Sequence, residues 1–296
     1  MRRISLIGLI ILLTTTIISA CQKEKPVETA IPLQDSTALR LGLMPTMSCL
    51  PFYYAEQVGI YDSLGLKIKI IPFNAQFDCD SALLGGSVDA AATDLLRFHH
   101  YQQHSQKLVA FMSIADSWSL IVTEKNPANN LQKIGNQTLA CSRFSASDYY
   151  SRIALLKAGL DADTLFRPQI NNLFLRTNML QGGQVDAAML PEPLATAACF
   201  HGGRRLYTSS FTDTIRTTCI AMQPERLNKE QKTILIKGYN QAAQIIENKI
   251  NNKLKNILLS TYKLEQEVCD SLRLPSPFPK ATQPAAISLQ ATRRSL

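Results

Sequence analysis

A segment of eight residues occurs twice in this chain of 296 residues. Residues 84–91 read LGGSVDAA and residues 181–188 read QGGQVDAA, so the two copies start 97 residues apart, and a leucine precedes each. In both copies we expect a short helix that the first glycine ends in the left-handed conformation, followed by a strand buried on both faces, because VDAA is small and apolar. A spacing of about one lobe's length predicts a molecule built from two similar halves.

Predicted strands and helices alternate around both copies of the repeat. The expected strands cover residues 41–44, 67–73, 90–93, 108–113 and 120–123 in the first half and residues 138–141, 173–175, 187–190 and 205–208 in the second. This alternation predicts an α/β fold with two parallel-type sheets and helices on both faces of each. A further strand at 214–222 and apolar residues at helical spacing over 228–262 indicate that the chain returns to the first lobe.

The N-terminus has the three regions of an export signal. Arg2 and Arg3 are followed by an apolar run over residues 4–18 and then by Ser19-Ala20-Cys21, which resembles a bacterial lipobox. We therefore expect a signal peptide over 1–20 and lipidation of Cys21, although a short N-terminal anchor helix is the alternative. The polar residues 21–38 predict a lipidated tether, and the protein would lie in the cell envelope facing the periplasm or the exterior.

Composition and charge exclude several classes of protein. Hydrophobic residues make up 46% of the chain and charged residues 18%, which disfavours disorder and coiled coil. The formal net charge of +8 falls to +6 without Arg2 and Arg3, and no basic run carries interleaved aromatic residues, so no nucleic-acid partner is expected. The six cysteines other than Cys21 match no zinc spacing, and the sequence leaves open whether they are paired.

Ligands of open parallel sheets bind beyond the carboxyl ends of the strands, which gives a set of candidate binding residues. Helix starts after Ser48 or Cys49 and after Ser145 or Ser147 would offer backbone N–H groups to an anion. Arg176 suits a carboxylate, sulfonate or phosphate unless it forms a structural ion pair. Asp94 and Glu192 instead suit a neutral or amine-bearing heterocycle, and the sequence does not choose between this ligand and an anion. The candidates are Thr46, Ser48, Tyr54, Asn74, Asp94, Trp118, Ser142, Ser145, Tyr149, Arg176 and Glu192.

Three segments together resemble a known family. They are LRLGLMP at residues 39–45, the run from LPFYYAEQ to AAATD at 50–94, and LRTNMLQGGQVDAAMLPEPLATAA at 175–198. They are similar to the periplasmic solute-binding proteins of ABC importers that bind nitrate, sulfonate, taurine or thiamine pyrimidines. The resemblance implies a type II periplasmic-binding-protein fold, a monomer that closes on a small molecule, and ABC permease transmembrane subunits as partners.

The resemblance also implies where the lobes join. The first part of lobe I would cover 39–124, lobe II 125–209 and the return segment of lobe I, with its C-terminal helices and extended tail, 210–296. The crossovers of the hinge would lie near residues 122–125 and 208–213. Pro275, Pro277 and Pro279 exclude a continued helix in the tail.

An enzyme of the same bilobed fold, acting on a small heterocyclic or carboxylate substrate, is the alternative function. The fungal branch of the family that makes a thiamine pyrimidine carries a CCCFC motif, whereas residues 198–201 here read ACFH. No nucleophile elbow, P-loop or HExxH pattern occurs. We therefore expect neither an enzyme nor a cofactor. His100 and His104 are spaced for a metal but lack an evident third ligand, so no metal site is predicted.

Overall fold

The computed structural model describes residues 38–104, 106–163, 165–209, 216–247 and 250–284. These residues belong to one compact unit that starts at Thr37. The expected signal peptide, Cys21, the tether up to residue 37 and residues 285–296 of the tail lie outside the described residues. Within the described ranges, no helix has both the length and the apolar composition needed to cross a membrane.

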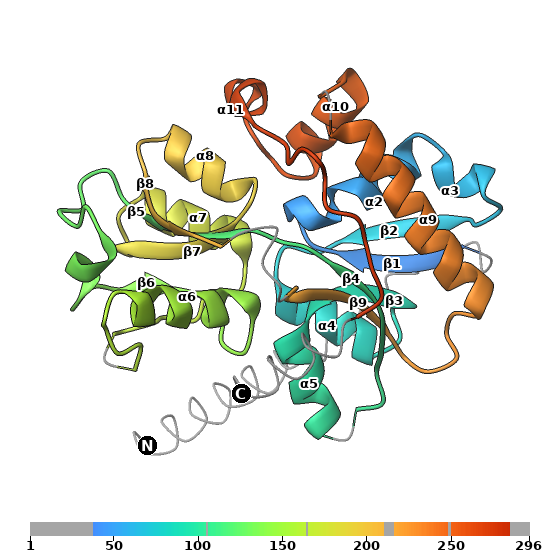
Figure 1. Cartoon of the computed structure of the whole chain (residues 1–296), viewed down its shortest axis with the longest axis horizontal. Helices are drawn as coiled ribbons and strands as arrows, with labels where there is room; N and C mark the ends of the chain where they lie inside the picture. Colours follow the sequence, from blue (N-terminus) through green and yellow to red (C-terminus); the bar gives the residue numbers. More distant parts are fainter. Residues whose placement is uncertain (1–37, 105, 164, 210–215, 248–249, 285–296) are drawn as a thin grey trace, which may run out of the picture. The chain divides into compact units, whose positions relative to one another are not determined.

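The described residues contain two separate β-sheets, as the repeat predicts (Figure 1). The first sheet has the strand order β2-β1-β3-β9-β4 and the second has the order β6-β7-β5-β8. Their strands are β1 (Leu39–Leu43), β2 (Ile68–Pro72), β3 (Ala90–Asp94), β4 (Val109–Ile114) and β9 (Thr218–Met222) in the first, and β5 (Trp118–Val122), β6 (Leu139–Ala140), β7 (Ala187–Pro191) and β8 (Arg204–Thr208) in the second. The expected α/β fold with two lobes is confirmed.

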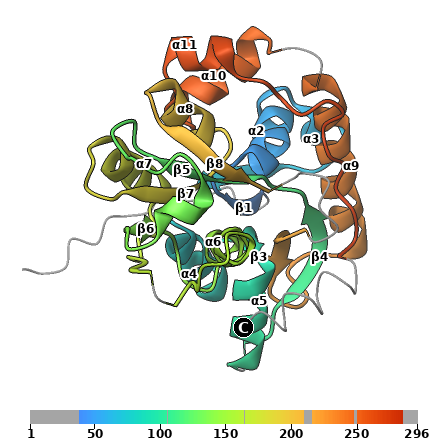
Figure 2. The same ribbon diagram turned by 60° about the vertical axis from the view of Figure 1, so that its left-hand side comes forward.

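Helices cover both faces of each sheet, as expected (Figure 1). They are η1 (Met47–Cys49), α2 (Leu50–Gln57), α3 (Ile60–Ser63), α4 (Gln76–Leu84), α5 (Leu95–Gln103), η2 (Leu131–Ile134), α6 (Ala146–Lys157), α7 (Leu173–Gln181), α8 (Leu194–Phe200), α9 (Lys229–Ile246), α10 (Asn252–Ser260) and α11 (Gln266–Ser271). α10 packs against α2 of the first lobe and α11 against α8 of the second (Figure 2). The C-terminal helices therefore contact both lobes.

Both sheets are mixed, which corrects the expectation of parallel-type sheets. β1 is parallel to β2 and β3, and β6 is parallel to β7, but β9 runs antiparallel to its neighbours β3 and β4. β5 likewise runs antiparallel to β7 and β8, with Trp118 at its start opposite Pro191 at the end of β7. β5 and β9 run in the opposite direction because each follows directly after a crossing from the other lobe. Each therefore enters its sheet at the end where the parallel strands finish.

The first crossing lies earlier than expected. β5 pairs with strands of the second sheet, so the chain leaves the first lobe over residues 115–117 rather than near 122–125. The return lies between β8 and β9, and residues 210–215 of it are outside the described ranges. The two crossings are joined, because the Ser117 hydroxyl donates to the Ser209 carbonyl at 2.9 Å and the Trp118 backbone N–H donates to the Ser209 hydroxyl at 2.9 Å.

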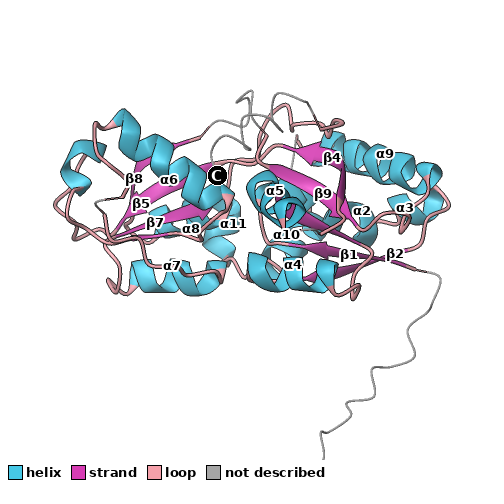
Figure 3. Ribbon diagram, turned by 90° about the horizontal axis from the view of Figure 1, so that it is seen from below, coloured by secondary structure: helices cyan, strands magenta, loops and turns pink. Residues whose placement is uncertain are grey.

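The sequence repeat is also a structural repeat. α4 and β3 span residues 76–84 and 90–94, and α7 and β7 span 173–181 and 187–191, so every boundary is displaced by the same 97 residues. Figure 3 shows α4 and α7 along the same side of the two sheets, and an isolated bridge between Ala75 and Asn172 joins their N-terminal ends. The repeat therefore aligns the two lobes at their junction.

Two details of the repeat differ from the expectation. Residues 173–175 form the first turn of α7 instead of a strand, because the Asn172 side chain accepts a hydrogen bond from the Leu175 backbone N–H at 3.0 Å and caps the helix. The second glycine of each pair, not the first, has the left-handed conformation, with φ of 72° at Gly86 and 69° at Gly183. The first glycine still belongs to the helix end, and the left-handed residue follows it.

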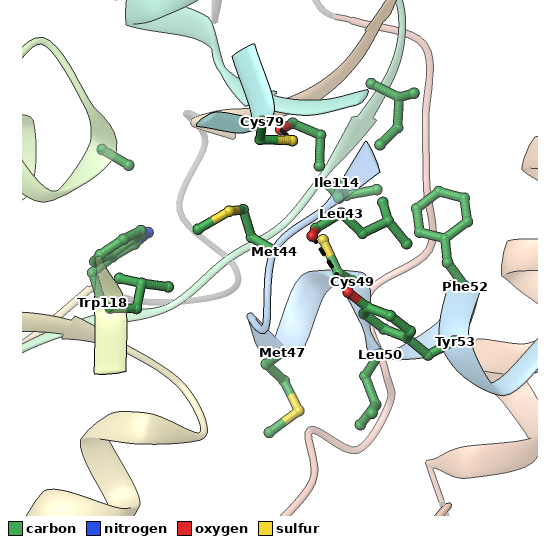
Figure 4. Packing of buried hydrophobic residues seen from close by; sticks show 14 of the residues in the cluster. Leu43, Met44, Met47, Cys49, Leu50, Phe52, Tyr53, Cys79, Ile114 and Trp118 are labelled. Carbon is green, nitrogen blue, oxygen red and sulfur yellow. Dashed lines mark hydrogen bonds between the residues drawn. The ribbon is translucent and has the colours of Figure 1, made fainter. Parts of the chain in front are cut away.

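The hydrophobic core between the first sheet and α2 reaches the junction between the lobes. In this core the Tyr53 hydroxyl donates to the Leu43 carbonyl at 3.4 Å, and Cys49 and Phe52 pack beside them (Figure 4). The proline-rich segment after α11 lies extended as expected, where Thr282 and Ser113 exchange backbone hydrogen bonds of 2.7 and 3.0 Å. This segment continues the first sheet beyond β4.

Candidate functional site

A small cavity lies between the two sheets. Its volume is about 20 Å³, which is enough for one water molecule, so a larger ligand requires the sheets to move apart. Each lobe and the crossing between them contribute lining residues. These are Met44, Thr46, Cys49, Gln76, Ala92, Asp94, Asp116 and Thr218 from the first lobe and the crossing, and Trp118, Ser142, Ser145, Ser147, Asn171, Leu173 and Arg176 from the second.

Six of the eleven predicted binding residues line this cavity, and five do not. Those that line it are Thr46, Asp94, Trp118, Ser142, Ser145 and Arg176. Although Arg176 lies inside α7 and not after a strand, the capped first turn of that helix places it at the same edge of the sheet.

Ser48 and Glu192 lie behind the cavity and do not line it. The Ser48 hydroxyl donates to Asp116 at 3.0 Å and pairs with the Thr46 hydroxyl at 2.8 Å, so it holds two lining residues. The Glu192 carboxylate accepts hydrogen bonds from Arg205 at 2.6 Å and from the Thr196 hydroxyl at 2.7 Å. Its side chain is therefore occupied within the second lobe.

Tyr54, Asn74 and Tyr149 also do not line the cavity. The Tyr54 hydroxyl accepts a hydrogen bond from the Asn251 amide at 2.9 Å, so it ties α2 to the start of α10. Asn74 is exposed, and its backbone carbonyl accepts from the Leu173 N–H at 2.9 Å. The Tyr149 ring packs edge-on against Tyr150, with centroids 5.2 Å apart.

Arg176 is a buried cation that backbone carbonyls hold in place. Its side chain donates to the Ile170 carbonyl from Nε at 2.9 Å and from Nη2 at 2.6 Å, and to the Met189 carbonyl from Nη1 at 2.8 Å. A guanidinium has five N–H groups, so two remain after these three bonds. None of the ion pairs among the described residues involves Arg176, and the structural ion pair considered as an alternative is not formed there.

Burial makes the charge of Arg176 costly. Loss of solvent lowers the pKa of its guanidinium to about 10, and the nearby Cys141 and Asp94 oppose this shift only in part. A buried charge with hydrogen bonds but no counter-ion is stabilised when an opposite charge is placed beside it. The site can therefore bind an anion.

Two buried carboxyls face the same cavity. Burial raises the pKa of Asp94 to about 7, against a hydrogen bond from the Ala146 backbone N–H at the start of α6. Burial likewise raises the pKa of Asp116 to about 7, although the Ser48 and Thr218 hydroxyls donate to it at 3.0 and 3.4 Å. Each group is within reach of the other's charge, which further raises the pKa of Asp94.

Trp118 adds a hydrogen-bond donor without a partner. Its indole N–H is buried and has no hydrogen-bond acceptor among the described residues, while the residue as a whole is 6% exposed. The indole nitrogen lies on the edge of the ring that faces Met44, another lining residue (Figure 4). A buried donor of this kind is expected to find an acceptor, and the cavity is where one can bind.

The sequence missed Asp116, Gln76, Asn171 and several smaller lining residues. Asp116 belongs to the three-residue crossing, and a correct assignment of β5 to the second sheet would have marked it as a hinge residue. Asn171 accepts a hydrogen bond from the Ser142 hydroxyl at 2.7 Å, and it lies just before residues 173–175, which are helical and not the expected strand. No local pattern identifies Gln76, which enters the site because α4 and α7 begin side by side.

The six cysteines are not paired with one another, and His100 packs against the other lobe. Cys49, Cys79, Cys141, Cys199, Cys219 and Cys269 are all free thiols. The His100 ring stacks on Phe144 of the other lobe, with centroids 5.1 Å apart and planes 11° apart. No group of three or more potential metal ligands is found in the described part of the chain.

Comparisons with solved structures show the fold. The aliphatic sulphonate binding protein SsuA from Escherichia coli matches with a TM-score of 0.69 at 19% identity, covering 88% of this chain and 85% of that one. SsuA from Xanthomonas axonopodis pv. citri, bound to MOPS, gives 0.72 at 18% identity over 88% and 91% of the two chains. The nitrate-binding protein NrtA from Synechocystis PCC 6803 gives 0.67 at 13% identity over 86% and 75%.

The periplasmic binding protein fold of these structures agrees with the two sheets and the cavity between them. A search of curated protein sequences gave no match. A family model described as NMT1/THI5 like matches residues 46–201, just over half of the chain and most of the cavity lining. The chain belongs to the NMT1/THI5-like family.

Proposed function

We propose that this protein is an extracytoplasmic solute-binding protein that captures a small oxyanion-bearing molecule between its two lobes and delivers it to an ABC importer. The observation that carries the proposal is Arg176, a cation 1% exposed in the interlobe cavity, with two N–H groups left and no ion-pair partner among the described residues. The sulphonate-binding and nitrate-binding proteins of the same fold, whose ligands are oxyanions, support it.

Contacts across the junction indicate how the protein would close on a ligand. The Met47 backbone N–H donates to the Glu192 carbonyl at 2.6 Å, and the Leu173 N–H donates to the Asn74 carbonyl at 2.9 Å. Both bonds join the lobes, which the chain itself connects through the two crossings. Rotation about the crossings would break these bonds and admit the ligand, and the ligand would favour the closed form through contacts that exist only there.

The proposal includes the location of the protein. Cys21 would be lipidated, residues 21–38 would act as the tether, and the lobes would work as a monomer beside the transmembrane subunits of a permease. The exchange Cys21→Ser should release the protein from membranes into the soluble envelope fraction. Retention of the variant in the membrane until detergent is added would instead support an N-terminal anchor helix.

Calorimetry with the purified lipoprotein in detergent tests the binding function. Nitrate, methanesulfonate and propane-1-sulfonate serve as probes, and native mass spectrometry detects any small molecule retained on purification. We expect saturable binding of one molecule per chain and recovery of that molecule unchanged. Chemical conversion of the bound molecule would favour the enzyme alternative, and the absence of any bound or retained molecule would contradict the proposal.

A further inference from the structure

We propose that the second lobe carries an additional binding site, which takes a small organic acid through its carboxylate. The site is a pocket of about 230 Å³ beside α6, lined by residues 143–144, 148, 152, 162–163 and 165–167. None of these residues lines the interlobe cavity, and we call their site the outer pocket. Its function goes beyond the proposed function and does not depend on it.

Arg167 offers the outer pocket an unused edge of its guanidinium. Only 11% of its side chain is exposed, and its Nη1 donates to the Asp148 carboxylate at 2.5 Å and to the Ser151 hydroxyl at 3.3 Å. Its Nε–H is buried without an acceptor among the described residues. The Asp163 carboxylate lies 3.6 Å from Nη2, which is too far to accept a hydrogen bond. Nε and Nη2 form one edge of the group, from which two parallel N–H bonds can reach both oxygens of a carboxylate.

The charges that line the outer pocket suit a ligand with one negative charge. Arg152 and Arg167 both pair with Asp148 and Asp163. Arg143 is exposed and forms no ion pair among the described residues. Three guanidiniums and two carboxylates leave a net charge of +1 in this pocket. A carboxylate neutralises that charge, whereas a doubly charged phosphate would leave an excess of negative charge beside the two aspartates.

Two exposed rings favour an acid with an apolar body. Phe144 and Phe166 line the outer pocket and are 47% and 69% exposed, and the buried Leu165 lines it as well. Pockets for small molecules combine apolar walls of this kind with a few polar groups that fix the orientation of the ligand. The carboxylate would lie at Arg167 and Arg143, and the apolar body would lie against the two rings.

The backbone of Phe144 has an uncommon conformation. Its φ is 55°, in the left-handed region that residues with a side chain seldom adopt. Such conformations persist where the surrounding structure fixes them, and they cluster at ligand sites. Here the Phe144 N–H donates to the Asp148 carboxylate at 3.2 Å, and the same carboxylate accepts from Arg167. One aspartate therefore positions both a ring and a cation of the outer pocket.

Calorimetry with four probes tests the ligand class. Benzoate carries a carboxylate and a ring, benzamide replaces the carboxylate by a neutral amide, acetate lacks the ring, and inorganic phosphate carries more charge. The purified lipoprotein is titrated in detergent at about pH 7.5, where benzoate is ionised, and titrations of micelles alone are subtracted. We expect benzoate to bind at least about tenfold more tightly than each of the other three probes.

Variants of the outer pocket test its residues. Arg167→Lys keeps the charge but loses the edge of two parallel N–H groups, so it should weaken benzoate at least about tenfold. Arg143→Ala and Phe166→Ala change exposed side chains and should each weaken benzoate about three- to tenfold. The matched controls are Arg273→Ala and Phe200→Ala, an exposed arginine after α11 and an exposed ring of α8. Both lie outside the pocket and should change the affinity by less than about twofold.

Thermal unfolding shows whether Arg167→Lys is folded, and the two exposed variants keep the test decisive if it is not. Trp118, the only tryptophan of the chain, lines the interlobe cavity, so its fluorescence reports binding there. Absence of benzoate binding overturns the inference. Benzoate binding that changes the Trp118 signal and that Arg143→Ala and Phe166→Ala leave intact also overturns it, because the acid then binds in the interlobe cavity.

Two further outcomes concern the ligand class alone. Equal or tighter binding of benzamide or phosphate overturns the assignment to a carboxylate, and equal binding of acetate overturns the role of the two rings. Each of these results leaves the proposed function standing, because nitrate and methanesulfonate test that function separately.

Discussion

At the scale of residues, the repeat places side chains of different chemistry at equivalent backbone positions in the two lobes. Arg176 and Cys79 occupy equivalent positions, 97 residues apart, in α7 and α4. The Cys79 thiol donates to the Ala92 carbonyl at 3.7 Å, and the Arg176 guanidinium donates to the equivalent Met189 carbonyl at 2.8 Å. The same strand carbonyl thus receives a weak thiol donor in one lobe and a buried cation in the other.

Substitution of Arg176 should weaken the binding of methanesulfonate in particular. Arg176→Ala removes a charge-assisted hydrogen bond of about 1.5–3 kcal/mol, so the dissociation constant should rise about ten- to a hundredfold. Arg176→Lys keeps the charge but cannot offer two parallel N–H groups, and we expect an intermediate value. Calorimetry measures both.

The matched control for this test is Arg152→Ala. Arg152 is 45% exposed in its side chain and pairs with Asp148 and Asp163 away from the cavity, so its loss should change the dissociation constant by less than about twofold. Arg176→Ala also leaves the Ile170 and Met189 carbonyls without donors, so thermal unfolding has to show that the variant is folded. An Arg176→Lys variant that is folded and binds like Arg176→Ala would assign the effect to the fork geometry, and unchanged binding in both would remove Arg176 from the site.

At the scale of elements, the sequence predicted the units whose order is local and failed where order depends on distant contacts. The helix, glycine pair and small apolar strand of the repeat are all encoded within about 20 residues, and both copies formed. The direction of β5 and β9 is not encoded in their hydrophobic pattern. It follows from the lobe that the chain has just left, and β5 was therefore assigned to the wrong sheet.

The same reasoning explains which site residues could be predicted. The strand-end rule located Asp94, Ser142 and Ser145, because these positions depend only on where a strand stops. It misplaced Glu192, which follows β7 and whose carboxylate accepts a hydrogen bond from Arg205 of β8, two strands away in the same sheet. No local pattern in the sequence predicts this pair. Asp116 required knowledge of the crossing.

A glycine in the middle of α9 provides a test of element packing. A Cβ at Gly238 would lie 2.4 Å from the Cε1 atom of the Tyr61 ring in α3, and Tyr61 is only 1% exposed. In an open helix Gly→Ala gains up to about 1 kcal/mol, but here the methyl group has no room. We expect Gly238→Ala to lower the free energy of unfolding by about 1–3 kcal/mol, measured by urea denaturation.

Lys237→Ala is the matched control, because Lys237 is the exposed neighbour of Gly238 in the same helix. Its effect on the free energy of unfolding should stay within about 0.5 kcal/mol. A Gly238→Ala variant as stable as the wild type would mean that α3 moves away from α9 at little cost. The Tyr61 hydroxyl, which donates to the Leu235 carbonyl at 3.3 Å, holds α3 against that movement.

At the scale of the whole molecule, the two buried carboxyls couple the stability of the fold to pH. The folded protein raises the pKa of Asp94 and of Asp116 to about 7, whereas an aspartate of an unfolded chain titrates near 3.9. Between these values the folded state binds more protons than the unfolded state, so the free energy of unfolding falls as the pH rises. The loss starts above about pH 4 and is complete above about pH 7, with at most about 4 kcal/mol for each carboxyl.

Urea denaturation of the ligand-free protein at several pH values between about 5 and 8 measures this loss. Burial lowers the pKa of His100, which acts in the opposite direction below about pH 6.5, so the informative quantity is the difference between wild type and variant. Asp116→Asn cannot ionise and should become more stable relative to the wild type as the pH rises through this window. Glu267→Gln, an exposed carboxyl of α11, should track the wild type. Parallel curves for Asp116→Asn and the wild type would contradict this prediction, because they would mean that burial does not raise the pKa of the Asp116 carboxyl in the folded protein.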